Sequence, residues 1–342
     1  MLKVAWPFGI HTGGKAVTIL SRAALAISLA AAAASAPAPA RAQDYPKSTV
    51  TIVSGFAPGS TADVTARIVG KAMEAKLGQS FIVENRLGAA SSVAAAGVAR
   101  GAKDGYTLFM GSVANIVNAA MRSDLTFDFA KDFVPITLLT STPVVLVVGT
   151  EAPAKTVKDL LQLAKDKPDA LLFGSSGVGS STHLALEQFK YTSKVKITHV
   201  PYTGSPGVVT DLLANRIHGY FAPANSVWEH VKVGKLVALG VTDARRSEFF
   251  PQLPTIAEAG IPGFEAALWF GLMAPAGTPQ AVIDTLSRAA TEALASENVR
   301  QAFKAQYISP IGGSPEDFRR TIAAETERWT AVVDAAGLKK KQ

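Results

Sequence analysis

The chain has 342 residues, with 34 Lys and Arg against 27 Asp and Glu and no Cys. Without disulfides the fold must depend on its core, and a chain of this length can build one, more readily as two domains than as one. Four basic and no acidic residues fall within positions 1–42, so the net charge drops from +7 to +3 for the remainder. This near balance, without a Lys/Arg stripe interleaved with aromatic residues, argues against nucleic-acid binding.

Residues 1–42 have the features of a cleaved export signal. Lys3, Lys15 and Arg22 make a basic start, an apolar run follows at 23–34, and Ala-Arg-Ala at 40–42 fits a small-x-small cleavage site. We expect the mature chain to begin near Gln43 and to be a soluble protein outside the cytoplasm. The alternative is an uncleaved membrane anchor, although the apolar run is short for a membrane span.

The first informative stretch of the mature chain is a strand, a small-residue loop and a helix. The apolar, β-branched run at 50–53 predicts a buried strand, a Pro-Gly pair interrupts it, and apolar residues then recur at helical spacing up to Leu77. Free N–H groups at such a helix start form a candidate anion site. The competing interpretation is that Ser60 or Thr61 only caps the helix and that Asp63 complements its dipole.

Strand-like and helix-like segments alternate through the rest of the chain. This alternation predicts an α/β fold, with helices on the faces of a parallel sheet. The further expected strands are 81–83, 106–110, 133–139, 144–148, 171–174, 195–200, 217–221, 236–241 and 268–274. The further expected helices are 92–100, 157–165, 184–189, 208–213, 227–233, 279–294 and 318–336.

Several strand ends carry loops of small hydroxyl residues and glycines. Residues 171–189 repeat the architecture of the first stretch, with a Gly/Ser loop at 175–182, and similar loops occur at 111–115 and 202–207. Together with 55–61, these loops have the composition of a site that binds a small anion through backbone N–H and hydroxyl groups. They lack the perturbed acid or base that catalysis requires.

Known cofactor and catalytic motifs find little support. The loop at 177–182 has Thr182 where a dinucleotide fingerprint needs Gly, and it lacks the Lys of a phosphate-binding loop. No Gly-x-Ser-x-Gly elbow occurs, and the histidines beyond residue 42 lack metal-ligand spacing. We therefore expect no metal and no cofactor. A secreted hydrolase that uses Ser181, with His183 nearby, is the rival interpretation from another class.

Six motifs carry a resemblance to a known family. They are Phe-Ala-Pro-Gly at 56–59 with Asp63, Val-Glu-Asn-Arg-Leu-Gly-Ala at 83–89, Asp-Gly-Tyr-Thr-Leu at 104–108, His-Val-Pro-Tyr-Thr-Gly at 199–204, Pro-Thr-Ile-Ala-Glu-Ala-Gly at 254–260 and Ala-Pro-Ala-Gly-Thr-Pro at 274–279. With these motifs the chain, from about 45 to about 338, resembles the Bug-type periplasmic solute-binding proteins of tripartite tricarboxylate transporters.

The resemblance implies a two-lobed periplasmic binding-protein fold of type II-like form, with a mostly parallel sheet in each lobe and the ligand cleft between lobes. Lobe 1 would be 46–145 plus 268–342, and lobe 2 would be 146–267. The protein would be a monomeric, non-enzymatic receptor in the periplasm. It would capture a di- or tricarboxylate or an aromatic acid and deliver it to the transporter's membrane subunits. The alternative is the same receptor feeding a two-component sensor.

The resemblance also places the ligand among the loops already described. The residues expected to bind one carboxylate are Gly59, Ser60 and Thr61. The residues expected to bind the other end of the ligand, or a polar group on it, are Ser180, Ser181 and Thr203. The expected pocket walls are Phe56, Tyr202 and Trp269. The remaining expected contacts are Ala57, Ser112, Ser176, Gly179, Gly204 and Ala222.

Two departures from the family pattern bear on the ligand. The family's first loop is usually rich in glycine after Pro-Gly, whereas Ser60 and Thr61 add side-chain donors here. Family members that bind amino acids often have Asp after the strand matching 217–221, where Ala222 and Pro223 stand in this chain. We therefore expect α-amino acids to be poor ligands.

Overall fold

A computed structural model describes residues 1–3, 5, 45–152, 154–335 and 337–339. The expected cleavage site at 40–42 lies outside these residues. From Tyr45 onward the chain forms one unit, distinct from the segment before it. None of the described helices is long and apolar enough to cross a membrane.

Sheet A has six strands in the order β11-β4-β10-β3-β1-β2. Their bounds are β1 Val50–Ser54, β2 Phe81–Asn85, β3 Thr107–Ser112, β4 Phe133–Thr142, β10 Leu268–Pro275 and β11 Ser309–Pro310. β1 pairs in parallel with β2 and β3. β10 runs antiparallel to β3 and β4, and β11 antiparallel to β4.

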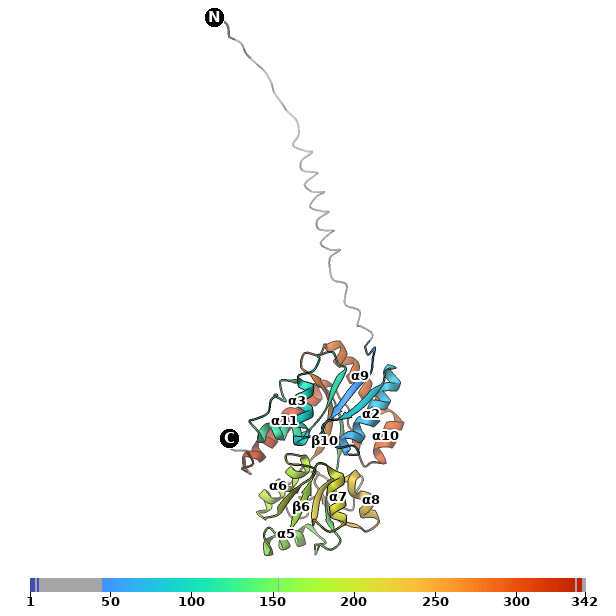
Figure 1. The fold of residues 1–342 in the computed structure, drawn as a ribbon, viewed down its shortest axis with the longest axis vertical. Coiled ribbons are helices and arrows are strands. Elements are labelled where there is room, and N and C mark those ends of the chain that lie inside the picture. Colours follow the sequence, from blue (N-terminus) through green and yellow to red (C-terminus); the bar gives the residue numbers. More distant parts are fainter. Residues whose placement is uncertain (4, 6–44, 153, 336, 340–342) are drawn as a thin grey trace. The chain divides into compact units, whose positions relative to one another are not determined.

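The helices of sheet A form two packed groups. Their bounds are α2 Thr61–Leu77, α3 Ser92–Ala99, α4 Val113–Met121, α9 Gln280–Ala295, α10 Glu297–Lys304 and α11 Pro315–Ala335, with a short 3₁₀ turn, η1, at Ala89–Ser91. α2 packs against α9 and α10, whereas α4 packs against α3 and α11. Figure 1 shows α3 and α11 on one side of β10, and α2 and α10 on the other.

Sheet B has five strands in the order β7-β6-β8-β5-β9. Their bounds are β5 Val144–Gly149, β6 Leu172–Ser175, β7 Thr198–Pro201, β8 Gly219–Pro223 and β9 Leu236–Val241. β6 is parallel to β7 and β8, and β5 is antiparallel to β8 and β9. The helices around this sheet are α5 Val157–Asp166, α6 Ser181–Ser193, α7 Ser205–Leu213 and α8 Ala224–Lys232; Figure 1 shows α6 on one side of β6 and α7 on the other.

Strand β5 shows how the apolar pattern builds sheet B. Each of its residues is buried, as the uniformly apolar run predicts for a strand covered on both faces. Val145 and Val147 join one hydrophobic cluster, whereas Leu146 and Val148 join another. Successive side chains of a strand point to opposite faces, so the two clusters lie on the two faces of the sheet.

The chain passes between the sheets at two places that are hydrogen-bonded to each other. Pro143 is the single residue between β4 and β5, and the return runs from the end of β9 to β10. The Thr242 N–H donates to the Val144 carbonyl at 2.9 Å, and the Ala266 N–H donates to the Thr242 carbonyl at 3.0 Å. The Thr242 hydroxyl also donates to the Ala266 carbonyl at 2.6 Å. The two connections therefore form one narrow bridge between the sheets.

The expected elements are largely present, with two kinds of difference. The sheets are mixed rather than mostly parallel, because the strands next to the crossings, β5 and β10, run against their neighbours. Helices α4 and α10 are additional to the expected ones. In α4 almost every residue is buried, including the polar Asn115 and Asn118.

Candidate functional site

The loop between β1 and α2 is closed by a buried carboxylate. Ser60 caps α2 by accepting a hydrogen bond from the Asp63 N–H at 3.4 Å. The Asp63 side chain accepts from the Gly59 N–H and from Asn85 Nδ2, both at 3.0 Å, and forms an ion pair with Arg67 at 2.9 Å. Burial alone would raise the pKa of Asp63, but hydrogen bonds, led by the one from Arg67, lower it below its ordinary value. The expected capping is thus present, and the Gly59 donor has a partner inside the protein.

The loop between β6 and α6 is held by neutral groups instead. Ser180 caps α6 by accepting from the His183 N–H at 3.3 Å. The Thr182 hydroxyl oxygen accepts from the Ser176 N–H at 2.9 Å and lies 3.0 Å from the Ser180 hydroxyl. Gly179 has a φ of +81°, which favours glycine, and its N–H donates to His183 Nδ1 at 3.2 Å. Hydroxyls and an imidazole therefore hold the second loop.

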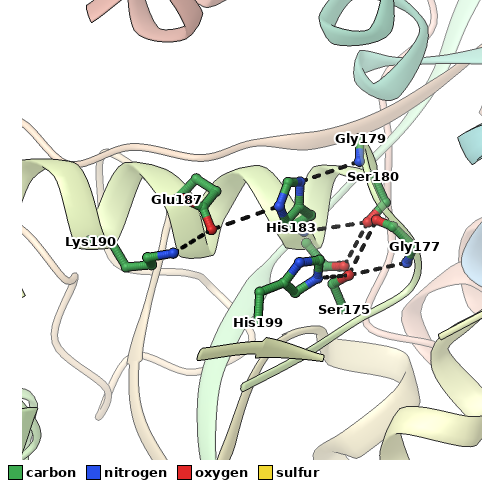
Figure 2. Close-up of polar contacts among 9 residues, drawn as sticks. Ser175, Gly177, Gly179, Ser180, His183, Glu187, Lys190 and His199 are labelled. Carbon is green, nitrogen blue, oxygen red and sulfur yellow. Dashed lines mark hydrogen bonds and ion pairs between the residues drawn. The ribbon is translucent and has the colours of Figure 1, made fainter. Parts of the chain in front are cut away.

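Two imidazoles lie close together, tilted by 31°, behind this second loop. The rings of His183 and His199 have centroids 4.1 Å apart, and Figure 2 shows them beside Ser175. His199 Nε2 lies 2.6 Å from Ser175 Oγ, and His183 Nε2 faces Glu187 Oε1 at 3.7 Å. Burial lowers the pKa of both rings to about 4, and nearby Lys190 adds to the effect. Both rings are neutral near pH 7, and His183, whose Nδ1 accepts, carries its proton on Nε2.

The third loop runs from β7 to α7 and approaches the first. The Tyr202 hydroxyl donates to the Asp211 carboxylate at 2.7 Å. Burial and this hydrogen bond raise the pKa of Tyr202 to about 12, so its phenol is neutral. A Cβ added at Gly204 would lie 3.1 Å from the Cβ of Ala57, which shows how closely the first and third loops approach each other.

The three loops surround two adjoining cavities that share Phe56 and Ser176. The inner cavity measures about 20 Å³ and is lined by Phe56, Ser60, Thr61, Ala62, Ser176, Ser181, Thr182, Gly204, Ser205, Pro223, Leu268 and Phe270. The outer cavity measures about 310 Å³ and is lined by Gly55, Phe56, Leu87, Gly88, Ala89, Ala90, Ser176, Gly177, Val178, Pro201, Tyr202 and Thr203. Elements of both sheets contribute to each cavity.

The N-termini of α2 and α6 meet at the inner cavity. Thr61 and Ala62 begin α2, Ser181 and Thr182 begin α6, and all four residues line this cavity. The first N–H groups of a helix have no partner within the helix, and each N-terminus carries a partial positive charge. Two such ends at one cavity, together with six hydroxyl-bearing residues in its lining, favour a bound anion.

Eight of the fifteen expected site residues line one of the cavities. They are Phe56, Ser60, Thr61, Ser176, Ser181, Tyr202, Thr203 and Gly204. Those that line neither are Ala57, Gly59, Ser112, Gly179, Ser180, Ala222 and Trp269. Of these, Ser180 caps α6, and Ser112 donates from both its N–H and its hydroxyl to Asn115 at the start of α4. A role in ligand contact remains a prediction for all fifteen.

Trp269 lies on the far side of its strand from the cavities. Its neighbours Leu268 and Phe270 line the inner cavity, whereas the Trp269 ring packs edge-on against Phe318 of α11, with centroids 5.5 Å apart. Since side chains alternate along a strand, Trp269 and its two neighbours must face opposite ways. The sequence predicts a pocket wall at Trp269, whereas the residues of β10 that line the inner cavity are Leu268 and Phe270.

The expected site residues do not include the apolar residues of the outer cavity. Leu87, Ala89, Ala90, Val178 and Pro201 line it. In the sequence, the motif that contains Leu87 and Ala89 serves as a mark of the family and does not point to the site. The sequence feature that could have indicated these residues is the presence of large apolar side chains inside loops of otherwise small and polar residues.

Hydrogen bonds cross from elements of sheet A to elements of sheet B around the cavities. The Thr61 hydroxyl donates to Asn225 Oδ1 of α8 at 2.8 Å. Asn118 Nδ2 of α4 donates to the Gly179 carbonyl at 3.5 Å. These contacts hold the loops of the two sheets close together over the inner cavity.

The arrangement does not support Ser181 as a nucleophile. Both histidines near it have other partners: His183 bonds to Gly179 and faces Glu187, and His199 bonds to Ser175. Ser175 itself is fully buried, behind the loop. Among the described residues, no group of three His, Cys, Asp or Glu side chains could hold a metal ion.

Comparison with known proteins gives a consistent picture. A family model described as the tripartite tricarboxylate transporter family receptor, TctC, matches residues 65–338. BugT of Bordetella pertussis is 34% identical over 88% of this chain and 93% of its own. The structure of R. palustris Rpa4515 with adipate is 36% identical, with a TM-score of 0.82, over 86% of this chain and 98% of that chain. MatC (Rpa3494) of Rhodopseudomonas palustris, with bound malate, is 30% identical, with a TM-score of 0.81, over 84% and 100%.

These similarities confirm the expected family and the fold class of periplasmic binding proteins. The family and the fold are those of solute-binding receptors rather than of enzymes. Their extent matters, because the family model and the relatives cover most of this chain. The chain belongs to the tripartite tricarboxylate transporter receptor family, a family of periplasmic solute-binding receptors.

Proposed function

We propose that this protein is a periplasmic receptor that captures a small organic carboxylate and delivers it to the membrane subunits of a tripartite tricarboxylate-type transporter. The observation that carries the proposal is the meeting of the α2 and α6 N-termini at the inner cavity. A carboxylate at that point would meet unpaired N–H groups and two partial positive charges. Adipate and malate in two relatives support the same class of ligand.

In this proposal the two sheets, with their helices, act as lobes that close over the ligand. The lobes expected from the sequence are 46–145 plus 268–342 and 146–267, and the first boundary would lie at Pro143, because Val144 and Val145 belong to β5 of sheet B. The hydrogen-bonded bridge at Thr242 and Ala266 would serve as the hinge, since a few residues that join two rigid bodies absorb such motions. The bond between Thr61 and Asn225 would then be a contact of the closed form.

The expected site residues take different parts in this scheme. Thr61 would bind the carboxylate through its N–H, because its hydroxyl donates to Asn225, and Ser181 would bind it through its N–H and hydroxyl, with Ser60 and Ser176 beside them. Thr203 and Tyr202 would contact the rest of the ligand in the outer cavity. Gly59, Gly179 and Ser180, which line neither cavity, would act by shaping the loops.

The proposal is tested by thermal unfolding of the purified protein with a panel of carboxylates. A ligand at 100 times its dissociation constant should stabilise the fold by about 2.7 kcal/mol, a rise of several degrees in Tm. Aspartate and glutamate should shift Tm less than the corresponding plain acids, because Ala222 and Pro223 offer no carboxylate for an ammonium group.

Two controls separate a receptor from an enzyme. The ligand should be recovered unchanged after long incubation. Ser181→Ala should weaken binding several-fold, as loss of one hydrogen bond of about 1 kcal/mol predicts, with no turnover to lose. A panel that leaves Tm unchanged, after denaturation and refolding to remove any bound ligand, would refute the carboxylate assignment.

A further inference from the structure

A further contact between the two halves of the protein lies outside the ligand cavities. Tyr307 follows α10, in the half built on sheet A. Its ring packs against three aromatic residues of the half built on sheet B, with centroid distances of 5.3 Å to Phe250, 6.1 Å to Phe249 and 6.3 Å to Trp228. None of these four is among the described residues that line the two cavities. Tyr307 therefore joins the halves where a ligand in the cavities does not reach.

Tyr307 packs at the edge of a hydrophobic cluster that otherwise belongs to the half built on sheet B. The other described members of this cluster all lie between Val145 and Leu253. The residues around Tyr307 belong to the other cluster, which contains the core of sheet A: Phe303 of α10 and Ile308 are both fully buried there. The Tyr307 side chain thus reaches from a segment anchored in one half into the core of the other.

The backbone at Tyr307 has a conformation that favours glycine. Its φ angle is +55°, and its N–H donates to the Lys304 carbonyl at 3.1 Å just after α10 ends. Glycine is the usual residue at such a helix end, because a Cβ is strained in the left-handed region. A tyrosine at this position persists only because the contacts of its side chain offset the strain.

Helix α8 receives hydrogen bonds from the sheet A half at two positions. The Thr61 hydroxyl donates to Asn225 beside the inner cavity, and the Tyr307 hydroxyl donates to Glu229 Oε1 at 2.9 Å. Asn225 and Glu229 are four residues apart, so they share one face of α8. A helix moves as a rigid element, so a motion that takes Asn225 away from Thr61 would also carry Glu229 away from Tyr307.

We infer that Tyr307 is a positioning residue that holds this face of α8 in the closed form and thereby raises the affinity for the ligand without contacting it. This inference rests on the proposed function, in which the lobes close over the ligand. A contact made in the closed form raises the fraction of molecules that are closed, and the apparent affinity rises in proportion to that fraction. The ring contributes through its aromatic contacts and the hydroxyl through its bond to Glu229.

The rate of disulfide formation across the cleft measures the closed fraction in the ligand-free protein. A Cβ at Gly204 would lie 3.1 Å from the Cβ of Ala57, so cysteines at these two positions need only a small adjustment to bond in the closed form. The chain has no other Cys. Opening and closing are much faster than thiol–disulfide exchange. The rate at which the Ala57→Cys/Gly204→Cys protein reacts with oxidised glutathione to form its internal disulfide is therefore proportional to the closed fraction.

Substitution of Tyr307 in this background should slow disulfide formation. Tyr307→Gly should lower the rate about tenfold, because it removes the ring and the hydroxyl, and it should fold, because glycine suits the φ angle. Tyr307→Phe should lower the rate about twofold, because it loses only the bond to Glu229. The matched control is Tyr191→Ala on α6, whose half-exposed ring contacts Lys194 of the same half; its rate should equal that of the parent.

Two results of the disulfide assay would overturn the inference. One is a rate for Tyr307→Gly that equals or exceeds that of the parent. The other is an equally low rate for Tyr191→Ala, because the effect would then be a general loss of stability.

Ligand affinity should follow the closed fraction. Calorimetry with adipate, or with the acid of the panel that raises Tm most, should show about tenfold weaker binding to Tyr307→Gly than to the wild type. Unchanged affinity would overturn the inference and leave the proposed function intact. Failure of every carboxylate to bind would refute the proposed function, whereas the disulfide rates would still decide whether Tyr307 holds the closed form.

Discussion

The loops after β1 and after β6 have the same architecture but are held by opposite kinds of chemistry. Each follows a buried strand, ends in a serine cap and begins a helix whose N-terminus reaches the inner cavity. The first is held by the ionised Asp63 with its partners Arg67 and Asn85. The second is held by the neutral imidazole of His183.

This difference predicts different sensitivities for the two halves of the site. A carboxylate with a lowered pKa remains charged at any moderately acidic pH. An imidazole that accepts a hydrogen bond at Nδ1 loses that bond when it is protonated, because both ring nitrogens then donate. The first loop should therefore be insensitive to mild acid, and the second should loosen.

Removal of the Asp63 carboxylate should have the largest effect on stability. Asp63→Ala leaves the Gly59 N–H, Asn85 and Arg67 without their acceptor, and the Asp63 side chain is only 4% exposed. We expect a loss of about 3 kcal/mol in the free energy of unfolding, measured by urea denaturation.

The matched control for Asp63→Ala is Glu74→Gln on the same helix. Glu74 forms an ion pair with Lys71 at the surface, and such pairs contribute little. The urea midpoint of this variant should stay at the wild-type value. An Asp63→Ala variant as stable as Glu74→Gln would show that the first loop does not depend on its carboxylate.

Mild acid should have the next largest effect, through the second loop. The pKa of His183 and of His199 falls from about 6.5 to about 4 on folding, chiefly because both rings are buried. The unfolded chain therefore takes up protons between these values, and the free energy of unfolding falls as the pH falls through this window. For His183 alone we expect a loss of about 2 kcal/mol between pH 7 and pH 5, since pH 5 lies about 1.5 units below its ordinary pKa and one pKa unit corresponds to about 1.4 kcal/mol.

Titration of Asp243 changes the free energy of unfolding in the opposite direction, and its contribution must be measured separately from that of the histidines. Burial, with a contribution from Glu265, raises its pKa to about 6, so its effect is to lower stability as the pH rises through that value. The histidine contribution is therefore measured as the difference in pH profile between the wild type and His183→Gln. Parallel profiles from pH 7 to pH 4 would contradict the assignment of the sensitive group to the second loop.

The features of this site that depend on residues close together in the chain are predictable from the sequence. The cap at Ser60 and the helix that ends before Gly78 follow from turn chemistry and helical spacing over a few residues. A Pro-Gly pair or a Gly/Ser run after an apolar strand carries that information by itself. For this reason the loops after β1 and after β6 are predictable from the sequence.

The non-local parts were not predictable in the same way. Whether Trp269 or its neighbours face the cavity depends on which face of β10 is covered by Phe318, some fifty residues later in the chain. The contribution of Leu87 and Val178 to one wall depends on how closely loops from two different sheets approach. Hydroxyl caps and ligand donors also look alike in sequence, as Ser180 illustrates.

Each of the two loops contains a glycine with a positive φ angle, Gly59 in the first and Gly179 in the second. Gly59 and Gly179 have nearly equal φ angles, +77° and +81°, so alanine should strain the backbone of either loop by about 1 kcal/mol. A Cβ at Gly59 would meet open space, whereas one at Gly179 would lie 2.4 Å from Asn118 Oδ1. Gly179→Ala should therefore also push apart the contact between α4 and the second loop.

Binding measurements separate the two effects of these substitutions. Gly59→Ala should lower Tm by a few degrees, as a loss of about 1 kcal/mol predicts, and should weaken carboxylate affinity less than Gly179→Ala does, because the Gly59 N–H already donates to Asp63. Gly179→Ala should lower Tm by a similar amount or more and weaken affinity about tenfold, because the second loop cannot close against Asn118. Shortening the side chain in Gly179→Ala/Asn118→Ala should restore part of the affinity. If it does not, backbone strain alone accounts for the loss, and the contact across the cleft has no part in closure.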